Sequence, residues 1–404
     1  MRIAINDHSG HSFILQLSRQ LSKMGHEVLH SYSTSFQSPK GDFTKKNSDP
    51  HNFNILPIAN KKPFAKYSLL KRRKQEIEYA DLLIEQLREF RPEALIAGTA
   101  PLFVQEHLQK YCLANDISFY YWCQDIYSEA IKKIARRKIG FLGLPLWTYF
   151  KRLEVGLLKS STHVIIITED FNGTLQKWGI AKARITCIPN WAPIEEIKIF
   201  PKVNYWSLRY SVDKKICITY SGTLGLKHNP LMLSGAAKFF KNRMDVKFIV
   251  ISEGLGADIL KKEKEAFDLH NLDLLPFQSF KDMGAVLGAS DVLLGILEGD
   301  AGEFSVPSKV LTYLCAEKPI VLGVPLNNLS AKIVQSANAG LCGEPSDIKG
   351  FCNNISILIN DQSLRAELGN NGRKYALENF DIHTIAEKFI NILETNRSVL
   401  ASNF

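Results

Sequence analysis

The feature that most constrains the fold is an alternation of short apolar segments with amphipathic, helix-like segments, which stops midway along the chain and then restarts. Arg2–Asn6 is apolar and breaks at Asp7, and a helical repeat of apolar residues separates it from the next apolar segment, Glu27–Ser31. The alternation of strand-like and helix-like segments ends near residue 194 and begins again at Ile216. Strands that alternate with helices in this way form parallel sheets. The sequence therefore predicts an α/β protein with two doubly wound domains.

The length of the chain agrees with two domains, because a single core rarely grows beyond about 250–300 residues and this chain has 404. We expect an N-terminal domain at residues 1–200, a C-terminal domain at residues 201–380, and a helix at residues 381–404 that packs back toward the first domain. Ligands of doubly wound sheets bind beyond the carboxyl ends of the strands. A ligand site in a cleft between the two domains is the expected arrangement.

Charge and cysteine content argue against several classes of protein. The formal net charge is +9, and the whole excess of Lys and Arg lies in residues 1–200. The seven cysteines form no C-x-x-C pair and no cluster with histidines, which argues against a disulfide scaffold and a zinc site. The chain has no apolar run of about 18 residues and no signal-peptide pattern at its start. We expect a cytoplasmic protein without a membrane span and without a bound metal.

Three breaks follow strands of the predicted second domain, where they could converge on one diphosphate. Ser221–Lys227 would offer glycine amides and a lysine to an anion, and Ser252–Gly254 is a second glycine turn. At the third break, Ser305 can cap a helix and Pro307 suits its first turn. Lys309 would then face the positive end of the helix dipole, which is unfavourable unless an anion is bound. An ordinary tight turn and a solvated lysine are the alternatives.

Polar residues also follow strands of the predicted first domain. Gly10 follows the first strand, and Asp125 directly follows an apolar strand, where a carboxylate is costly unless it binds a partner or caps a helix. Both interpretations of Asp125 stay open. His8 and His11 are three residues apart, but no third ligand is nearby, so we interpret them as polar contacts in the cleft rather than as metal ligands.

Basic residues alternate with bulky apolar residues in two stretches of the first domain, Lys61–Lys74 and Lys132–Arg152. This composition suits an anionic membrane interface, which attracts each basic residue by about 1 kcal/mol. Nucleic acid would attract the same charge, but no nucleic-acid-binding module is recognisable. A solvated, charged helix is an alternative for residues 71–89. We predict peripheral membrane contact and no nucleic-acid partner.

Seven short motifs span nearly the whole chain: Gly25–Val28, Trp122–Asp125, Ile188–Trp191, Tyr220–His228, Leu275–Gln278, Phe304–Val310 and Lys318–Val321. In sequence and order they resemble the motifs of the retaining, nucleotide-sugar-dependent glycosyltransferases of family 4. Within that family the chain is most similar to bacterial polysaccharide enzymes of the colanic-acid fucosyltransferase type. The resemblance implies the GT-B fold, in which two Rossmann-like domains face each other across a cleft.

The resemblance also implies a donor site in the second domain and an acceptor side in the first. The implied donor-binding residues are Gly222, Thr223, Gly225, Lys227, Glu253, Gly254, Phe277, Glu303, Ser305, Pro307, Ser308 and Lys309, and those of the acceptor side are His8, Gly10, His11 and Asp125. Lys227 and Lys309 would neutralise the leaving diphosphate, and Asp125 is a candidate base or acceptor anchor. No metal or other cofactor would be required.

One part of the family pattern is missing. Many family 4 enzymes carry two glutamates eight residues apart, the second of which commonly binds the ribose. Here Thr312 stands at the position of the second glutamate, and Glu303 lies one place from the position of the first. Ser252 likewise stands where a glycine is more usual.

These observations together predict a glycosyltransferase that moves a sugar from a UDP- or GDP-sugar, with retention, to a lipid-linked or polysaccharide acceptor. The implied setting is the synthesis of a bacterial surface glycan (capsule, O-antigen or exopolysaccharide) at the inner face of the plasma membrane. Two alternatives remain at this point. One is a nucleotide-sugar 2-epimerase of the same fold, and the other is an inactive, sugar-nucleotide-binding partner subunit.

Overall fold

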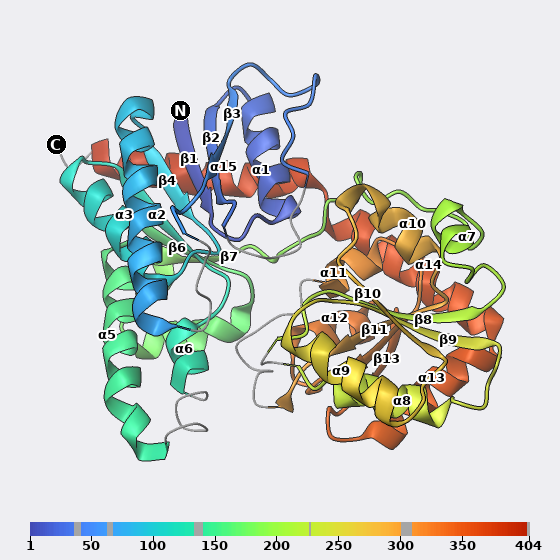
Figure 1. Ribbon diagram of the computed structural model, residues 1–404. Coiled ribbons are helices and arrows are strands. Elements are labelled where there is room, and N and C mark those ends of the chain that lie inside the picture. Colours follow the sequence, from blue (N-terminus) through green and yellow to red (C-terminus); the bar gives the residue numbers. More distant parts are fainter. Residues whose placement is uncertain (36–41, 63–67, 133–139, 226–227, 300–308, 402–404) are drawn as a thin grey trace. The chain divides into compact units, whose positions relative to one another are not determined.

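The computed structural model describes residues 1–404 except for residues 36–41, 63–67, 133–139, 226–227, 300–308 and 402–404 (Figure 1). The chain divides into two compact units, of which one holds residues 1–190 and 381–404 and the other residues 191–380. Each unit is built on a parallel sheet with helices packed against it. The predicted α/β class is therefore confirmed.

The first unit contains a parallel sheet with the strand order β3-β2-β1-β4-β5-β6-β7. Its strands are β1 (Arg2–Asp7), β2 (Glu27–Ser33), β3 (Phe53–Ile58), β4 (Ala94–Ala97), β5 (Ser118–Cys123), β6 (His163–Ile166) and β7 (Ile185–Cys187). Its described helices are α1 (Ser12–Lys23), α2 (Leu69–Phe90), α3 (Leu102–Ala114), α5 (Leu144–Ser160), α6 (Asn172–Lys177) and α15 (Ile382–Ala401). Strand β3 was not expected, because it lies in a polar stretch without a clear alternation.

The core of the first unit follows from its hydrophobic pattern. The central strands β1 and β4 are buried along nearly their whole length because helices cover both faces of the sheet. Helix α1 buries a stripe that includes Phe13, Leu17 and Leu21. Helix α15 packs against α1 (Figure 1), and the ring of Phe389 lies 4.9 Å from that of Trp122 on β5. The last helix of the chain is thus part of the core of the first unit.

The second unit contains a parallel sheet with the strand order β10-β9-β8-β11-β12-β13. Its strands are β8 (Ile216–Ser221), β9 (Val246–Ile251), β10 (Leu272–Leu275), β11 (Val292–Ile296), β12 (Ile320–Gly323) and β13 (Gly340–Gly343). Its described helices are α7 (Tyr205–Arg209), α8 (Leu231–Phe239), α9 (Leu255–Ala266), α10 (Met283–Gly288), α11 (Lys309–Leu314), α12 (Leu329–Ser336), α13 (Ile348–Asn360) and α14 (Gln362–Asn379).

The segment that enters the second unit packs tightly against α10. A Cβ atom on Gly284 or Gly288 would lie 2.5 Å from a backbone oxygen of this segment, that of Lys198 or Phe200 respectively. Lys202 forms an ion pair with Asp291. These contacts explain why the division between the units falls after Asn190, whereas the sequence placed a boundary near residue 200.

The strand order of both sheets reverses its direction of growth at a central strand. In the first unit this occurs between β1 and β4, and in the second between β8 and β11. Ligands of such sheets bind beyond the carboxyl ends of the strands at these points. We therefore expect a ligand site at the carboxyl ends of β1 and β8.

Candidate active site

The end of β8 is held by a tyrosine from α11. The hydroxyl of Tyr313 accepts a hydrogen bond from the backbone N–H of Ser221 (2.9 Å) and donates one to the carbonyl oxygen of the same residue (3.1 Å). Tyr313 is buried, and its neighbour Leu314 has no exposed surface. This pair of bonds fixes α11 beside the turn that follows β8.

Lys309, the first described residue of α11, places its ammonium group at this turn. Its Nζ atom lies 3.6 Å from the centroid of the Tyr220 ring, a cation–π contact. A Cβ atom on Gly222 would lie 3.0 Å from the same Nζ atom. The ammonium nitrogen is buried, and no described residue accepts a hydrogen bond from it. Burial lowers the pKa of Lys309 well below its usual value.

A buried cation without a hydrogen-bonded partner destabilises a protein unless a ligand supplies the missing charge. Because Gly222 has no side chain, the space beside the ammonium that a methyl group would occupy is left open. An anionic group at this position would accept hydrogen bonds from Lys309 and remove the penalty. The arrangement is therefore suited to bind an anion such as a phosphate.

The turn after β8 is rigidly supported. The backbone N–H of Leu224 donates to the hydroxyl of Ser252 (3.1 Å), and the Tyr220 hydroxyl donates to the carbonyl oxygen of Thr223 (2.9 Å). A Cβ atom on Gly256 of α9 would lie 2.4 Å from the Cβ of Leu224, so α9 approaches the turn as closely as a glycine allows. Ser252, which replaces the glycine expected from the family pattern, thus has a structural role.

Other predicted donor-binding residues lie at the ends of the neighbouring strands. Glu253 follows β9, and its carboxylate accepts a hydrogen bond from the backbone N–H of Phe277, which follows β10 (3.0 Å). Gly254 has a positive φ angle of 90° and precedes α9. The N–H of Gly225 donates to His228 Nδ1 (3.1 Å). The remaining predicted residues, Lys227, Glu303, Ser305, Pro307 and Ser308, lie outside the described residues.

Replacing Gly222 with alanine should weaken anion binding at this turn. The residue has a φ of +141°, where side chains are strained, and the new methyl group would lie 3.0 Å from Nζ and Cε of Lys309. We expect at least a tenfold loss of nucleoside-diphosphate affinity in titration calorimetry and a loss of roughly 1–3 kcal/mol in stability. Gly173→Ala, for which no atom lies within 4 Å of the new Cβ, is the matched control. Equal affinities for the two variants would contradict this assignment.

In the first unit the corresponding strand end is organised by Asp7, which sequence reasoning did not select. Its carboxylate is fully buried and accepts hydrogen bonds from the N–H groups of Gly10 (3.1 Å) and His11, and from the Thr99 hydroxyl (2.5 Å). His11 Nδ1 lies 3.2 Å from the same carboxylate. Burial by itself would raise the pKa of Asp7, but the charge and hydrogen bond of His11 lower it overall. Asp7 thus holds the turn as a buried anion.

The predicted acceptor-side residues on this turn lie in different environments. His8 is 1% exposed, and its ring meets the edge of the Tyr79 ring at 4.7 Å, so it is part of the core rather than of an open surface. Gly10 has a φ of +78°, and the side chain of His11 is 30% exposed. Of the two histidines, His11 is the one that a ligand could reach.

Asp125 follows β5 and is half-buried. The helix that begins two residues later is held by Glu154 of α5, whose carboxylate accepts the backbone N–H groups of Tyr127 (2.8 Å) and Ser128 (2.9 Å). The N-terminal end of that helix therefore has a carboxylate acceptor other than Asp125. Burial raises the pKa of Glu154 to about 7.

In the part of the chain that the structure describes, no three His, Cys, Asp or Glu side chains are grouped so that they could hold a metal ion. None of the helices among the described residues is long and apolar enough to cross a membrane.

The two parallel α/β sheets form the GT-B fold, which similar solved structures share. Residues 11–196 match the model of Glycosyltransferase Family 4, and residues 209–375 match that of Glycosyl transferases group 1. The two matches cover most of the chain, and the chain belongs to the retaining glycosyltransferases of family 4. The resemblance inferred from the sequence motifs is therefore confirmed.

Individual relatives are distant but similar over most of their length. The glycosyl transferase WcaI of Escherichia coli (strain K12), assigned to colanic acid biosynthesis, is 23% identical over 313 residues, which are 75% of this chain and 74% of WcaI. The structure of Anabaena Alr3699/HepE with UDP-glucose is 16% identical, with a TM-score of 0.71 over 98% of this chain and 100% of that chain. Sucrose-phosphate synthase of Thermosynechococcus elongatus is 14% identical, with a TM-score of 0.73 over 100% of both chains.

Proposed function

We propose that this glycosyltransferase moves a sugar from a nucleotide-sugar donor, with retention of the anomeric configuration, to a lipid-linked or polysaccharide acceptor in bacterial surface-glycan synthesis. The observation that carries the proposal is the buried ammonium of Lys309, which lies beside Gly222 at the end of β8 without an acceptor among the described residues. A donor diphosphate at this point would supply the missing charge.

The donor would be bound by the second unit. Lys309 would neutralise the negative charge that develops on the diphosphate as the bond to the sugar breaks, with Lys227 as a second cation. Glu253, Gly254 and Phe277 lie at the ends of β9 and β10, where a nucleoside could extend from the phosphates. We propose UDP or GDP as the nucleotide. The solved relative with bound UDP-glucose supports a donor of this kind.

The acceptor would be bound by the first unit, at the turn that Asp7 holds and at the end of β5. The side chain of His11 is 30% exposed and is available for contacts with hydroxyl groups of a sugar, whereas the Gly10 amide is bonded to Asp7 and shapes the turn. Asp125 is our candidate for the base or the acceptor anchor. The similarity to WcaI supports a bacterial polysaccharide as the product.

The proposal is tested first by donor consumption. Purified protein is screened with UDP and GDP by thermal shift, because a ligand at 100 times its dissociation constant adds about 2.7 kcal/mol of stability. The matching nucleotide sugars are then incubated with lipid-linked oligosaccharides, and the anomeric configuration of the product is determined by NMR. Conversion of the donor to its C2 epimer would favour the epimerase. Binding without any turnover or hydrolysis would favour an inactive subunit.

A basic and apolar surface in the first unit supports peripheral membrane contact. The guanidinium of Arg73 on α2 lies 4.9 Å from the ring centroid of Phe103, and Phe103 in turn contacts Phe150 of α5 (5.7 Å). The Phe103 ring therefore contacts residues of both basic stretches, Arg73 in the first and Phe150 in the second. Leu70 is 83% exposed beside Lys71, so an apolar side chain protrudes among the charges. We include an anionic membrane surface among the proposed partners.

Replacing Lys71, Lys74 and Arg152 with glutamine should weaken binding to anionic vesicles by roughly 100-fold at low salt, since each basic residue near such a surface contributes about 1 kcal/mol. Arg72 is left intact because it is hydrogen-bonded to Glu76. Vesicle co-sedimentation measures the effect. A triple variant of exposed lysines in the second unit, Lys214→Gln/Lys281→Gln/Lys349→Gln, is the control. Equal partition of the two variants would point to a different surface.

A further inference from the structure

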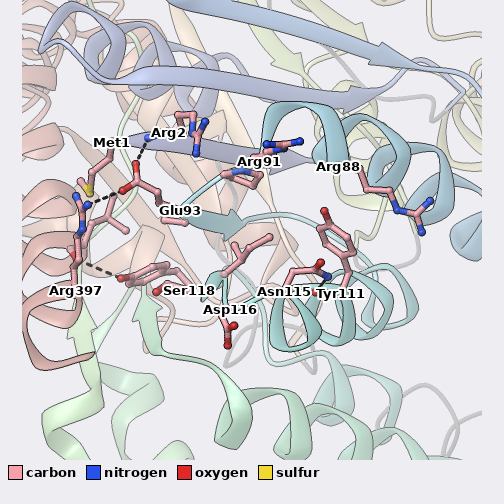
Figure 2. Close-up of a pocket in the computed structure, with 15 residues that line it drawn as sticks. Met1, Arg2, Arg88, Arg91, Glu93, Tyr111, Asn115, Asp116, Ser118 and Arg397 are labelled. Carbon is pink, nitrogen blue, oxygen red and sulfur yellow. Dashed lines mark hydrogen bonds and ion pairs between the residues drawn. The ribbon is translucent and has the colours of Figure 1, made fainter. Parts of the chain in front are cut away.

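A polar pocket lies in the first unit, and Figure 2 shows the residues that line it. It lies at the amino-terminal ends of the strands, whereas Asp7 and Asp125 lie at their carboxyl ends. Its walls are the amino-terminal ends of β1, β4 and β5, the carboxyl-terminal ends of α2 and α3, and α15. Its volume is about 570 Å³, which is within the usual range for a site that binds a small molecule. Because the strands are parallel, this end of the sheet is a full strand length away from the turn after β1.

The pocket has an excess of positive charge. Four arginines line it, namely Arg2, Arg88, Arg91 and Arg397, whereas its carboxylates are Glu93 and Asp116. Glu93 is already engaged, because it accepts the backbone N–H of Arg2 (2.8 Å) and pairs with Arg397 (2.8 Å; Figure 2). Among the described residues, no side chain pairs with the guanidinium of Arg2, Arg88 or Arg91. The three arginines are exposed, and the Glu93 carboxylate also interacts electrostatically with Arg2, so the surplus positive charge of the pocket comes mainly from Arg88 and Arg91.

Favourable interactions with helix dipoles explain the positions of only some of these four arginines. Arg88 lies in the last turn of α2 and Arg91 at its end, where a cation interacts favourably with the helix dipole. Arg2, however, belongs to β1, and Arg397 belongs to α15, 395 positions further along the chain than Arg2. Neither has a helix end of its own to neutralise. The pocket brings basic residues together from three segments that are distant in the sequence.

We propose that this pocket binds a phosphorylated small molecule. Guanidinium groups bind phosphate through paired N–H donors, and Arg2, Arg88 and Arg91 supply such groups among the residues that line the pocket. The polar side chains of Asn115 and Ser118 line the rest of the pocket and would contact the hydroxyl groups of the ligand body. The ring of Tyr111 forms a wall beside them.

Binding at this pocket would also act on the last helix. Leu393 and Arg397 of α15 line the pocket together with residues of β1 and α2. A phosphate held by arginines of α2 and by Arg397 would therefore join α15 more firmly to the sheet of the first unit. Amide hydrogen exchange in α15 should slow when the ligand is bound.

The test compares the full-length wild type with Arg88→Gln/Arg91→Gln, using inorganic phosphate and glucose 6-phosphate as probes in titration calorimetry. We expect at least tenfold weaker binding of a probe to the double variant, and slower hydrogen exchange of α15 only in the wild type. Lys261→Gln/Lys262→Gln, which removes two exposed charges from α9, is the matched control and should bind like the wild type. Lys309→Met distinguishes this pocket from the turn after β8, because it should lose the phosphate bound at that turn and keep the binding that depends on Arg88 and Arg91.

Three results would overturn the proposal. The first is the absence of saturable binding of both probes to the wild type at millimolar concentration. The second is an Arg88→Gln/Arg91→Gln affinity equal to that of the control. The third comes from vesicles of phosphatidylglycerol. If the double variant loses vesicle binding while neither protein binds the soluble probes, the arginines contact a lipid headgroup rather than a small molecule.

Discussion

Lys309→Met should abolish most of the nucleoside-diphosphate affinity of the protein while leaving the ligand-free form at least as stable as the wild type. Hydrogen bonds to charged groups contribute about 1.5–3 kcal/mol, so affinity should fall by roughly 10- to 150-fold. Stability should not fall, because the ammonium that is removed is buried without an acceptor among the described residues. The opposite signs of these two effects distinguish a ligand-binding lysine from a structural one.

The pH dependence of stability gives an independent check on Lys309. Burial lowers the folded pKa below the ordinary value of 10.5. Between these two pKa values the unfolded chain binds more protons at this position than the folded protein does, so the ligand-free wild type should gain stability as the pH rises. Lys309→Met should lack this gain, and bound nucleotide should reduce it in the wild type.

Chemical denaturation at several pH values and nucleotide titration by calorimetry measure both effects. Lys349→Met, which changes an exposed lysine of the same unit, is the control and should change neither quantity. If Lys309→Met titrates with UDP and GDP as the wild type does, the anion site at the end of β8 does not exist.

Asp7→Ala should destabilise the first unit by roughly 2–4 kcal/mol. The substitution would remove the carboxylate that accepts from the N–H of His11 and the Thr99 hydroxyl, and would leave the N–H of Gly10 only the carbonyl oxygen of residue 7. A buried group that loses its partner costs about 1–3 kcal/mol. Water can form hydrogen bonds with some of these groups in the variant, so the loss of stability should be smaller than the sum of the separate penalties. Transfer to the acceptor should fall with stability, because the turn that carries Gly10 and His11 would no longer be held.

The pH effect at Asp7 has the same sign as that at Lys309, since both folded pKa values are lowered, but it falls in the acid range. The folded pKa of Asp7 is lower than the ordinary value of 3.8, so its contribution to stability is fully present above the unfolded pKa and is lost as the pH falls through the folded pKa. The stability of Asp7→Ala should therefore depend less on pH in the acid range. Asp81→Ala, on the exposed face of α2, is the control. Denaturation curves that coincide for these two variants would contradict a structural role for Asp7.

The sequence predicted the class of fold because the pattern that defines it is local. Each buried strand of a parallel sheet is a short apolar run, and each crossover helix repeats its apolar residues at helical spacing. The exception is β3, whose sequence Phe53–Ile58 contains Asn54 and Pro57 and which lies at the edge of its sheet. An edge strand tolerates polar residues and proline, so it lacks the signal by which the others were found.

The candidate site was predictable only in part, because its supporting contacts join residues that are far apart in the chain. Gly222 and Lys309 could be selected from a glycine turn and a helix start. Tyr313, which holds the end of β8, lies 92 positions from its partner Ser221, and Thr99 lies 92 positions from Asp7. Nothing in the local sequence of either residue indicates such a bond. The sequence placed Lys309 in the first turn of a helix, but it did not indicate that the ammonium group packs on the Tyr220 ring.

The return of α15 to the first unit means that the chain passes between the units twice, once after Asn190 and once after Phe380. The second unit is therefore a single continuous piece of chain, whereas the first is completed only by a segment that follows the second unit in the sequence. A truncation within α15 would expose Trp122 and the neighbouring apolar face of α1 rather than damage the unit that precedes it in sequence. During synthesis the core of residues 1–190 can close only after the second unit and α15 have been made.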